Sequence, residues 1–487
     1  MYLKGIGIAS HPPVIIPEVG GGKELLAEKT VRGIRNLALK VAEIKPKTIV
    51  CITPHGNVFQ DGVAVIYETK ISGDLGAFGA PEVRIEKVCD MGILDEMNRR
   101  FAQNDCEAVF LNETSAKTFE IERNLDHGCL VPLYYIEKYY RDYKIVHITI
   151  GDLSLIELFR IGRIIREAIE VNGKDAMILC SADLSHCIKD EGPYRYDPAG
   201  PAFDEKIIND LKEKDYYDIL TMSPDLYEPA QQCGLRPMVM ALGATDSIKT
   251  HSRVFSYEAP FGVGYLSAYI DFALEEEDPI NESLISRYEK DMVKKHQERL
   301  EQEDAFTALA RRAVDCFVED GRKLNIEEAL EQMVDQEAAK RLKDEQAAVF
   351  VSLYKAGELR GCMGTLRPVT ENIAEEIVRN AIEAGVYDPR FLPVEPQELY
   401  QLEISVDILG EPEIIEDLSE LDPHQYGVIV EKDVRRGVLL PGIRGIDTVE
   451  TQLTIAKEKA GIYERDDEGD RLIVQRFAVE RHQADLK

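Results

Sequence analysis

Four of the nine histidines stand where their side chains could meet a ligand. They are His11, His55, His127 and His186. Each has proline, glycine or serine nearby, and these residue types form tight turns. Neutral imidazole is a common metal ligand, and its pKa of about 6.5 also suits a general base. A single such histidine is more often a hydrogen-bonded turn residue, but four together predict a site: two bind a divalent metal, a third moves protons and a fourth orients the substrate.

Three of these histidines directly follow short runs that are typical of strands. His11 follows Gly5–Ala9, His55 follows Thr48–Thr53 and His186 follows Ala176–Cys180, whereas His127 lies in a turn-like segment. In an open α/β sheet, ligands bind beyond the carboxyl ends of the strands, where residues distant in sequence meet. We therefore expect the histidines to gather at one edge of a sheet. His147 falls inside a predicted strand and is interpreted as a packed core residue.

The first 272 residues alternate short β-branched runs with helical patterns. The remaining predicted strands are Val63–Tyr67, Lys144–Ile150 and Gly264–Ile270, and the predicted helices include Glu24–Ile44, Leu155–Val171 and Leu235–Gly243. This alternation is typical of an α/β domain with a largely parallel sheet. We predict a three-layer sandwich for residues 1–272.

The composition changes after this domain. Residues 273–304 are rich in charged side chains and predict a linker or a solvated helix. Residues 305–487 then segregate helices from strands, which indicates an α+β domain. Its predicted elements are the helices Ala305–Val318 and Ile373–Ala384, the hairpin Ala347–Thr365 and the strands Leu402–Leu409, Gly427–Glu431 and Gly437–Leu440.

The composition argues against several classes of protein. The formal net charge of −31 disfavours broad nucleic-acid binding and binding to anionic membranes. The nine cysteines are scattered and favour reduced thiols in a cytoplasmic protein rather than a disulfide framework. We see no secretory signal and no apolar run long enough to span a membrane. Oligomeric state does not follow from the sequence.

The histidine motifs resemble those of a known family. Ser10-His11-Pro12, Pro54-His55-Gly56, Asp126-His127-Gly128 and Ala182-Asp183-Leu184-Ser185-His186 occur in the order seen in LigB-like class III extradiol dioxygenases, whose fold the Memo family shares. The resemblance implies that His11 and His55 bind a divalent transition metal, Fe(II) in the dioxygenases. It also implies that His186 is the catalytic acid or base and that His127 lies beside the metal ligands.

The third metal ligand is left open. The dioxygenase pattern has a glutamate before Cys-Gly, where this chain has Gln232, and a neutral amide replaces a carboxylate poorly at an iron site. Memo proteins have a cysteine near this position, so Cys233 is the alternative and would favour Zn(II) or Cu. Glu228 is less suited because it would reach back across Pro229. Arg236 could bind an anionic group of a small-molecule substrate, or form a surface ion pair.

The second domain contains a glycine-rich strand, Leu359-Arg360-Gly361-Cys362-Met363-Gly364-Thr365. An extended segment would place Arg360 and Cys362 on one face, above the space left by Gly364. Two interpretations stand: an anion-binding or thiol-reactive site, or a hairpin shaped by close packing at its glycines. The segment is similar to the signature of the AMMECR family, and the runs Asp388-Pro389-Arg390-Phe391 and Arg436–Pro441 fit the same family.

The pairing of the two domains resembles the family of AmmeMemoRadiSam system protein A. This resemblance implies a radical S-adenosylmethionine protein as a partner. We expect a non-haem metal site of the extradiol-dioxygenase type, with oxidoreductase chemistry on a small molecule. The alternatives are a non-enzymatic metal-binding or scaffold protein for that partner, and a metal-dependent hydrolase.

Overall fold

A computed structural model describes residues 1–104, 106–274, 280–355, 357–443, 445–463 and 472–484. The chain forms two compact units, residues 1–288 and 289–487. Within the charged segment predicted as a linker, residues 284–302 form the helix α11 (Leu284–Gln302), whose first amide donates to Asp246 Oδ1 at 2.7 Å. Residues 275–279 of that segment lie outside the described residues.

The first unit holds one large sheet and a separate hairpin. Its strands are β1 (Leu3–Ala9), β2 (Thr48–Thr53), β3 (Val63–Ile66), β4 (Lys70–Leu75), β5 (Ala80–Val88), β6 (Ala108–Leu111), β7 (Lys144–Thr149), β8 (Ala176–Ser181), β9 (Thr250–Glu258) and β10 (Tyr265–Phe272). Its further helices are α1 (Pro17–Gly20), α2 (Glu28–Ile44), α3 (Met91–Gln103), α4 (Glu113–Phe119), α5 (His127–Glu137), α6 (Leu155–Asn172), α7 (Ala199–Glu213), α8 (Tyr216–Leu220), α9 (Pro224–Tyr227) and α10 (Leu235–Gly243).

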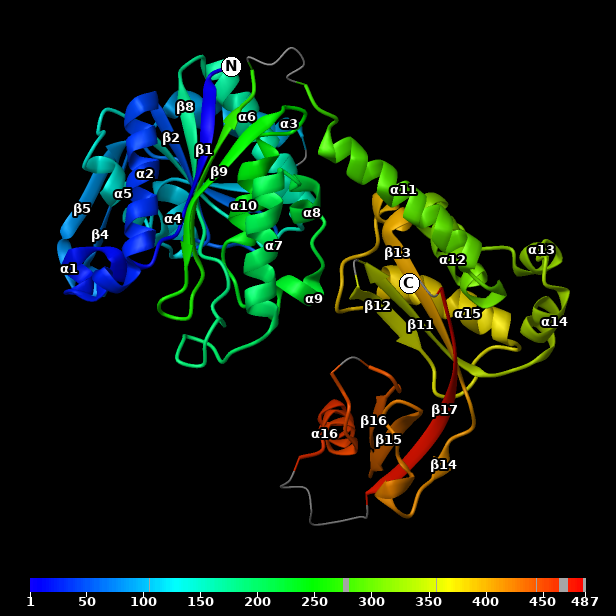
Figure 1. Ribbon diagram of the computed structural model, residues 1–487. Helices are drawn as coiled ribbons and strands as arrows, with labels where there is room; N and C mark the ends of the chain where they lie inside the picture. Colours follow the sequence, from blue (N-terminus) through cyan, green and yellow to red (C-terminus); the bar gives the residue numbers. More distant parts are fainter. Residues whose placement is uncertain (105, 275–279, 356, 444, 464–471, 485–487) are drawn as a thin grey trace. The chain divides into compact units, whose positions relative to one another are not determined.

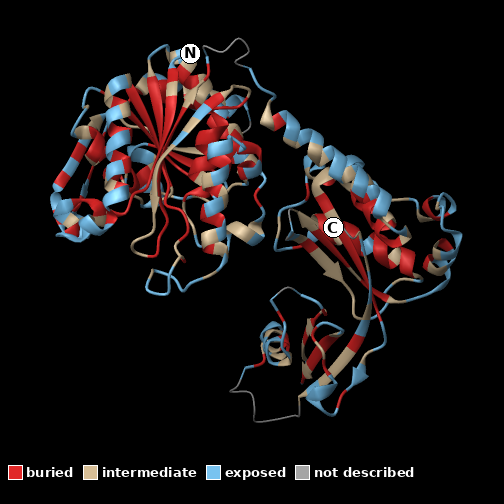
Figure 2. Ribbon diagram, viewed as in Figure 1, coloured by how far each residue is buried: buried red, intermediate tan, exposed pale blue. Residues whose placement is uncertain are grey.

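The strands of the large sheet run in the order β6-β3-β7-β2-β8-β1-β10-β9. The central block β7-β2-β8-β1 is parallel, while β3 pairs antiparallel with β7, and β10 pairs antiparallel with β1 and β9. Every residue of β2 and β8 is buried, which is expected of parallel strands covered on both faces. Figure 1 shows helices on both sides of this sheet, and Figure 2 shows its buried strands.

The predicted α/β domain with two helical layers is confirmed. Its sheet is mixed at both edges, because the strands β3, β9 and β10 run antiparallel to a neighbour. The predicted helix Glu24–Ile44 is interrupted: residues Lys23–Ala27 form a 3-10 turn, and α2 begins at Glu28. His127, expected in a turn-like segment between elements, is instead the first residue of the helix α5.

Close packing fixes the helix that follows Cys233. A Cβ atom added at Gly162 of α6 would lie 1.8 Å from Met240 O of α10, and one added at Gly243 would lie 1.9 Å from Phe159 O. The two helix backbones therefore touch, and only glycine allows this approach. The C-terminal half of α10 is therefore held directly against α6.

The second unit is an antiparallel sheet with helices, as the α+β prediction requires. Its strands are β11 (Ala348–Lys355), β12 (Glu358–Gly364), β13 (Leu402–Leu409), β14 (Glu413–Ile414), β15 (Tyr426–Lys432), β16 (Arg435–Leu439) and β17 (Ile473–Gln483). Its helices are α12 (Ala305–Asp320), α13 (Ile326–Glu331), α14 (Gln336–Asp344), α15 (Ile373–Ile382) and α16 (Val449–Lys459). The strand order is β12-β11-β13-β17-β15-β16, with β14 beside β17. The long β17 pairs with β13 at one end and β15 at the other.

Among the described residues, no helix combines the length and the apolar character needed to cross a membrane.

Candidate metal centre

The site lies at the carboxyl ends of three neighbouring parallel strands. His11 follows β1, His186 follows β8 and His55 follows β2, and these strands are adjacent in the order β2-β8-β1. Parallel strands end at the same edge, so segments that are far apart in the sequence deliver their side chains to one place. The strand order therefore brings these three histidines to one edge of the sheet, as expected.

Two imidazole nitrogens and one sulfur converge at this edge. His55 Nε2 lies 2.8 Å from His11 Nε2, and Cys233 Sγ lies 3.6 Å from His11 Nε2. The three ligand atoms all lie within 4.8 Å of one another. His11 is buried, Cys233 is partly buried and His55 is exposed, which leaves the group accessible from one side.

Hydrogen bonds set the orientation of the His11 ring. Its Nδ1 lies 2.7 Å from Ser181 Oγ, and the Ser181 hydroxyl donates to Gly128 O at 2.6 Å. Ser181 Oγ therefore accepts from His11 Nδ1, which leaves the lone pair on Nε2 facing Cys233 and His55. The backbone amide of His11 donates to Asp183 Oδ1 at 2.9 Å. Burial, reinforced by His127, lowers the pKa of His11 to about 3, so the ring is neutral at physiological pH.

Cys233 lies two residues before the first residue of α10 and supplies the sulfur atom of the group. Burial, reinforced by the Asp183 carboxylate, raises the pKa of its thiol well above the usual value. A bound cation would reverse this, because a coordinating thiol is deprotonated. Two imidazoles and one thiolate are a donor set that suits Zn(II) or Cu.

The Gln232 side chain bonds to the backbone at the start of α10, whereas that of Cys233 belongs to the group. Its Oε1 accepts a hydrogen bond from the backbone amide of Leu235 at 2.8 Å and so satisfies one of the free amides at the start of α10. A carboxylate does lie nearby, since Asp183 Oδ2 is 3.7 Å from His11 Nε2. Burial raises the pKa of Asp183 to about 6.

His127 borders a polar cleft next to the group of His11, His55 and Cys233. Its ring stacks on His55 with centroids 4.3 Å apart, and the Phe78 ring meets it edge-on with centroids 5.2 Å apart. The cleft has a volume of about 550 Å³ and is also lined by Asn57, Asp74, Arg84, Glu122 and Asn124. The β4-β5 hairpin, which the sequence patterns missed, forms one wall of this cleft.

His186 offers an unused ring nitrogen. Its Nε2 is buried and has no hydrogen-bond partner among the described residues. Burial lowers the pKa of this imidazole, while the neighbouring Asp183 raises it. A neutral imidazole with a free nitrogen is equipped to accept a proton.

Arg236 is occupied by other groups. Its guanidinium forms an ion pair with Asp152 at 2.9 Å and donates to the Leu153 carbonyl. This arrangement matches the surface ion pair considered as the alternative to substrate binding.

The sequence patterns did not assign roles to Ser181 or Thr53, and His147 was interpreted as core. His147 is indeed buried in β7, but its Nε2 also bonds to Asp126 Oδ2. With Cys129, these two residues form a second group of side chains that could hold a metal. The order of the strands, which the sequence does not state, is what brings these residues to the site.

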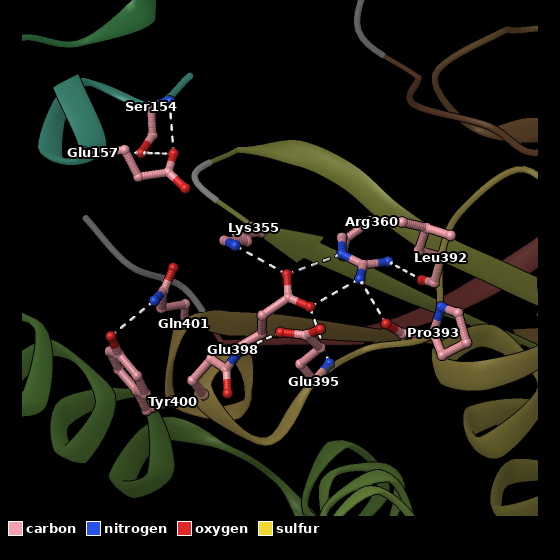
Figure 3. Close-up of polar contacts among 11 residues, drawn as sticks. Ser154, Glu157, Lys355, Arg360, Leu392, Pro393, Glu395, Glu398, Tyr400 and Gln401 are labelled. Carbon is pink, nitrogen blue, oxygen red and sulfur yellow. Dashed lines mark hydrogen bonds and ion pairs between the residues drawn. The ribbon is translucent and has the colours of Figure 1, made fainter. Parts of the chain in front are cut away.

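In the second unit, Arg360 is fully engaged (Figure 3). Its Nη2 and Nε lie 2.8 and 3.1 Å from the two oxygens of Glu398, and Nη1 donates to Leu392 O at 2.9 Å. Lys355 also bonds to Glu398, at 2.9 Å. The carboxylate of Glu398 therefore takes the place that an anionic ligand would occupy.

The glycines and Cys362 of the same strand are packed in a hairpin. A Cβ at Gly361 would lie 2.1 Å from Ala384 O, and one at Gly364 would lie 2.2 Å from the Phe350 ring. Burial raises the pKa of the Cys362 thiol, so it is not an activated thiolate. These contacts favour the close-packing interpretation of the motif.

Comparisons with known proteins cover nearly the whole chain. The family described as the catalytic LigB subunit of aromatic ring-opening dioxygenase matches residues 5–267, and AMMECR1 matches residues 307–482. A protein of Clostridium acetobutylicum is 39% identical over 482 residues, which cover 99% of each chain. A Thermotoga maritima protein is 48% identical over 181 residues, or 37% of this chain and 98% of its own.

Two solved structures of uncharacterized proteins are also similar. One, from Pyrococcus horikoshii, is 29% identical with a TM-score of 0.33, and covers 37% of this chain and 90% of that one. The other, from Escherichia coli K12, is 15% identical with a TM-score of 0.38, and covers 55% of this chain and 99% of that one. Both TM-scores are low, so the assignment depends on the family matches. The chain belongs to the family of the catalytic LigB subunit of aromatic ring-opening dioxygenases, joined to an AMMECR1 domain.

Proposed function

We propose that the LigB domain binds one divalent transition metal through His11, His55 and Cys233 and acts on a small molecule held in the adjoining cleft. The observation that carries this proposal is the meeting of two imidazole nitrogens and one thiol within 4.8 Å. The ligand set favours Zn(II) or Cu over Fe(II), because the non-haem iron triad includes a carboxylate.

The residues around the ligands supply the rest of the chemistry. When bound, such an ion polarises a substrate oxygen or lowers the pKa of a bound water. His186 takes up or releases a proton through its unpartnered Nε2, and His127 and Phe78 orient the substrate in the cleft. Hydrolysis of a polarised bond fits these roles. The family description names a different reaction, the opening of an aromatic ring by a dioxygenase.

Metal analysis tests the site directly. We expect one divalent ion per chain in protein purified without added metal, measured by plasma mass spectrometry. The double substitution His11→Ala and His55→Ala should abolish this content. The control is His424→Ala, which removes an exposed histidine of the second unit. Metal content that stays unchanged in the double variant would place the ion elsewhere.

A second candidate is a metal-binding protein without turnover of its own, working beside a radical S-adenosylmethionine partner. It is favoured by the position of Gln232, whose side chain bonds to the Leu235 amide rather than joining the ligands. We expect Gln232→Glu to keep that hydrogen bond and to gain neither Fe(II) affinity nor catechol oxygenation. A gain in both would instead favour a dioxygenase that has lost only its third ligand.

A further inference from the structure

We propose that His147 is a positioning residue of the metal centre, acting on both imidazole ligands through the first turn of α5. The inference rests on the proposed binding of a metal by His11, His55 and Cys233. The turn consists of Asp126, His127 and Gly128 and is called here the Asp126–Gly128 turn.

The Asp126–Gly128 turn is hydrogen-bonded to both imidazole ligands through one hydroxyl each. On one side, Asp126 Oδ1 accepts from the Thr53 hydroxyl at 2.7 Å, and Thr53 Oγ1 accepts from the His55 amide at 3.2 Å. On the other side, Gly128 O accepts from the Ser181 hydroxyl, whose oxygen accepts from His11 Nδ1. A shift of this turn would therefore move or reorient both ligands.

The side chain of Asp126 serves this network rather than its own helix. Asp126 occupies the N-cap position of α5, where an aspartate usually accepts from amides of the first turn. Here the side chain makes no capping hydrogen bond. Its Oδ1 faces Thr53, and its Oδ2 lies 2.7 Å from His147 Nε2. The direction of the carboxylate is thus set by Thr53 and His147.

Among the residues that the structure describes, the His147 ring makes a single hydrogen bond, from Nε2 to Asp126. The residue is 2% exposed, in the middle of β7 between Val146 and Ile148, and pairs in register with Cys51 of β2. Its Nδ1 is buried without a hydrogen-bond partner among the described residues. Leaving a polar atom buried and unpaired is unfavourable, and an apolar side chain would avoid it. Holding the Asp126 carboxylate is the role that accounts for an imidazole at this position.

The Asp126–Gly128 turn is packed closely against Thr53 and the Asp126 carboxylate. A Cβ at Gly128 would lie 2.5 Å from Thr53 Oγ1 and 2.7 Å from Asp126 Oδ1. The turn, Thr53 and the carboxylate are therefore packed against one another, so a carboxylate released by His147 displaces the turn rather than filling a void.

The test compares Zn(II) affinity, by competition with a chromogenic chelator, and the absorption spectrum of the Co(II)-loaded full chain. His147→Leu should weaken Zn(II) binding by roughly 10- to 100-fold, the usual effect of losing a group that orients a metal ligand, and should shift the Co(II) bands. His147→Gln places an amide donor near the position of Nε2 and should restore affinity to within roughly threefold of wild type, a much smaller loss than that of His147→Leu. Val146→Ala, a buried change on the opposite face of β7, should lower thermal stability without changing either metal readout.

A second pair of variants covers the case in which His147→Leu does not fold. Thr53→Val removes the bridging hydroxyl while keeping the shape of the side chain, and Thr53→Ser keeps the hydroxyl. We expect weaker Zn(II) binding for the first and near-native binding for the second. If wild type binds Zn(II) and both His147→Leu and Thr53→Val bind it equally well with unchanged spectra, the positioning role is wrong. If wild type itself binds no Zn(II) or Co(II), the proposed metal function fails and this inference fails with it.

Discussion

At the scale of single residues, the protonation states of the side chains determine how the site would bind a metal. His11 is neutral near physiological pH because burial lowers its pKa to about 3, and Asp183, with a pKa of about 6, is mostly ionised above pH 7. The thiol of Cys233 is the group that still carries its proton, since burial raises its pKa. Binding must therefore displace this proton.

We expect about one proton to be released per Zn(II) bound between pH 7 and 8, so that affinity rises about tenfold per pH unit. Titration calorimetry in two buffers of different ionisation enthalpy measures the proton count. Cys233→Ser should bring the number of released protons close to zero. It should also lower Zn(II) affinity by more than the roughly 10- to 100-fold loss expected when only a hydrogen-bond partner of a ligand is removed. Proton release that is unchanged in Cys233→Ser would mean that another group gives up the proton.

The ion pair between Arg360 and Glu398 makes a prediction about acid stability. Hydrogen bonds from Arg360 and Lys355 outweigh burial and hold the pKa of Glu398 down at about 2, against 4.5 for an ordinary glutamate. A depressed pKa contributes stability above pH 4.5 that is lost as the pH falls toward 2. Glu398→Gln should destabilise the second unit by about 2 kcal/mol at pH 7 and by much less near pH 2. Chemical denaturation at several pH values measures this, and an equal loss at every pH would contradict the ion-pair account.

At the scale of elements, strand order and close backbone approaches position the chemistry. The parallel strands β1, β8 and β2 bring three histidines together, and the contact of α10 with α6 fixes the segment that follows Cys233. In the second unit, β12 approaches the backbone at Ala384 so closely that a Cβ at Gly361 would lie 2.1 Å from a carbonyl oxygen.

Gly361→Ala should therefore destabilise the second unit by about 1–3 kcal/mol, the usual range for overpacking. Gly410→Ala is the matched control, because the nearest atom to its added Cβ is 3.5 Å away. Thermal unfolding of the two variants compares them directly. Equal stability of both variants would show that β12 can move away from Ala384.

Much of this arrangement was predictable from the sequence. The histidines that follow β1, β2 and β8 were found because a buried strand followed by a turn residue is a local pattern. The β4-β5 hairpin and the contact of His147 with Asp126 were missed, because exposed strand residues lack a clear pattern and the neighbour of β7 is set by the whole sheet. The choice between Gln232 and Cys233 also needed the fold, since it depends on which side chain the start of α10 turns toward His11.

At the scale of the whole molecule, each unit has its own buried core. The core of residues 1–288 contains the sheet around β2 and β8, and a separate core joins α12 and α15 to β11 and β13. All three proposed ligands and the Asp126–Gly128 turn lie within the first unit.

A fragment of residues 1–288 should therefore fold and bind one Zn(II) with the affinity of the full chain. Circular dichroism checks its folding, and chelator competition checks its affinity. A folded fragment with much weaker binding would show that the AMMECR1 domain contributes to the site.

The central claim is that two imidazoles and one thiolate hold a single metal ion. Anaerobic titration of the metal-free full chain with Co(II), followed by absorption, tests it most directly. We predict saturation at one equivalent, with visible bands of a low-coordinate ion and a near-ultraviolet sulfur-to-metal band that Cys233→Ser abolishes. Saturation without any sulfur-to-metal band, or bands that are unchanged in Cys233→Ser, would contradict the claim.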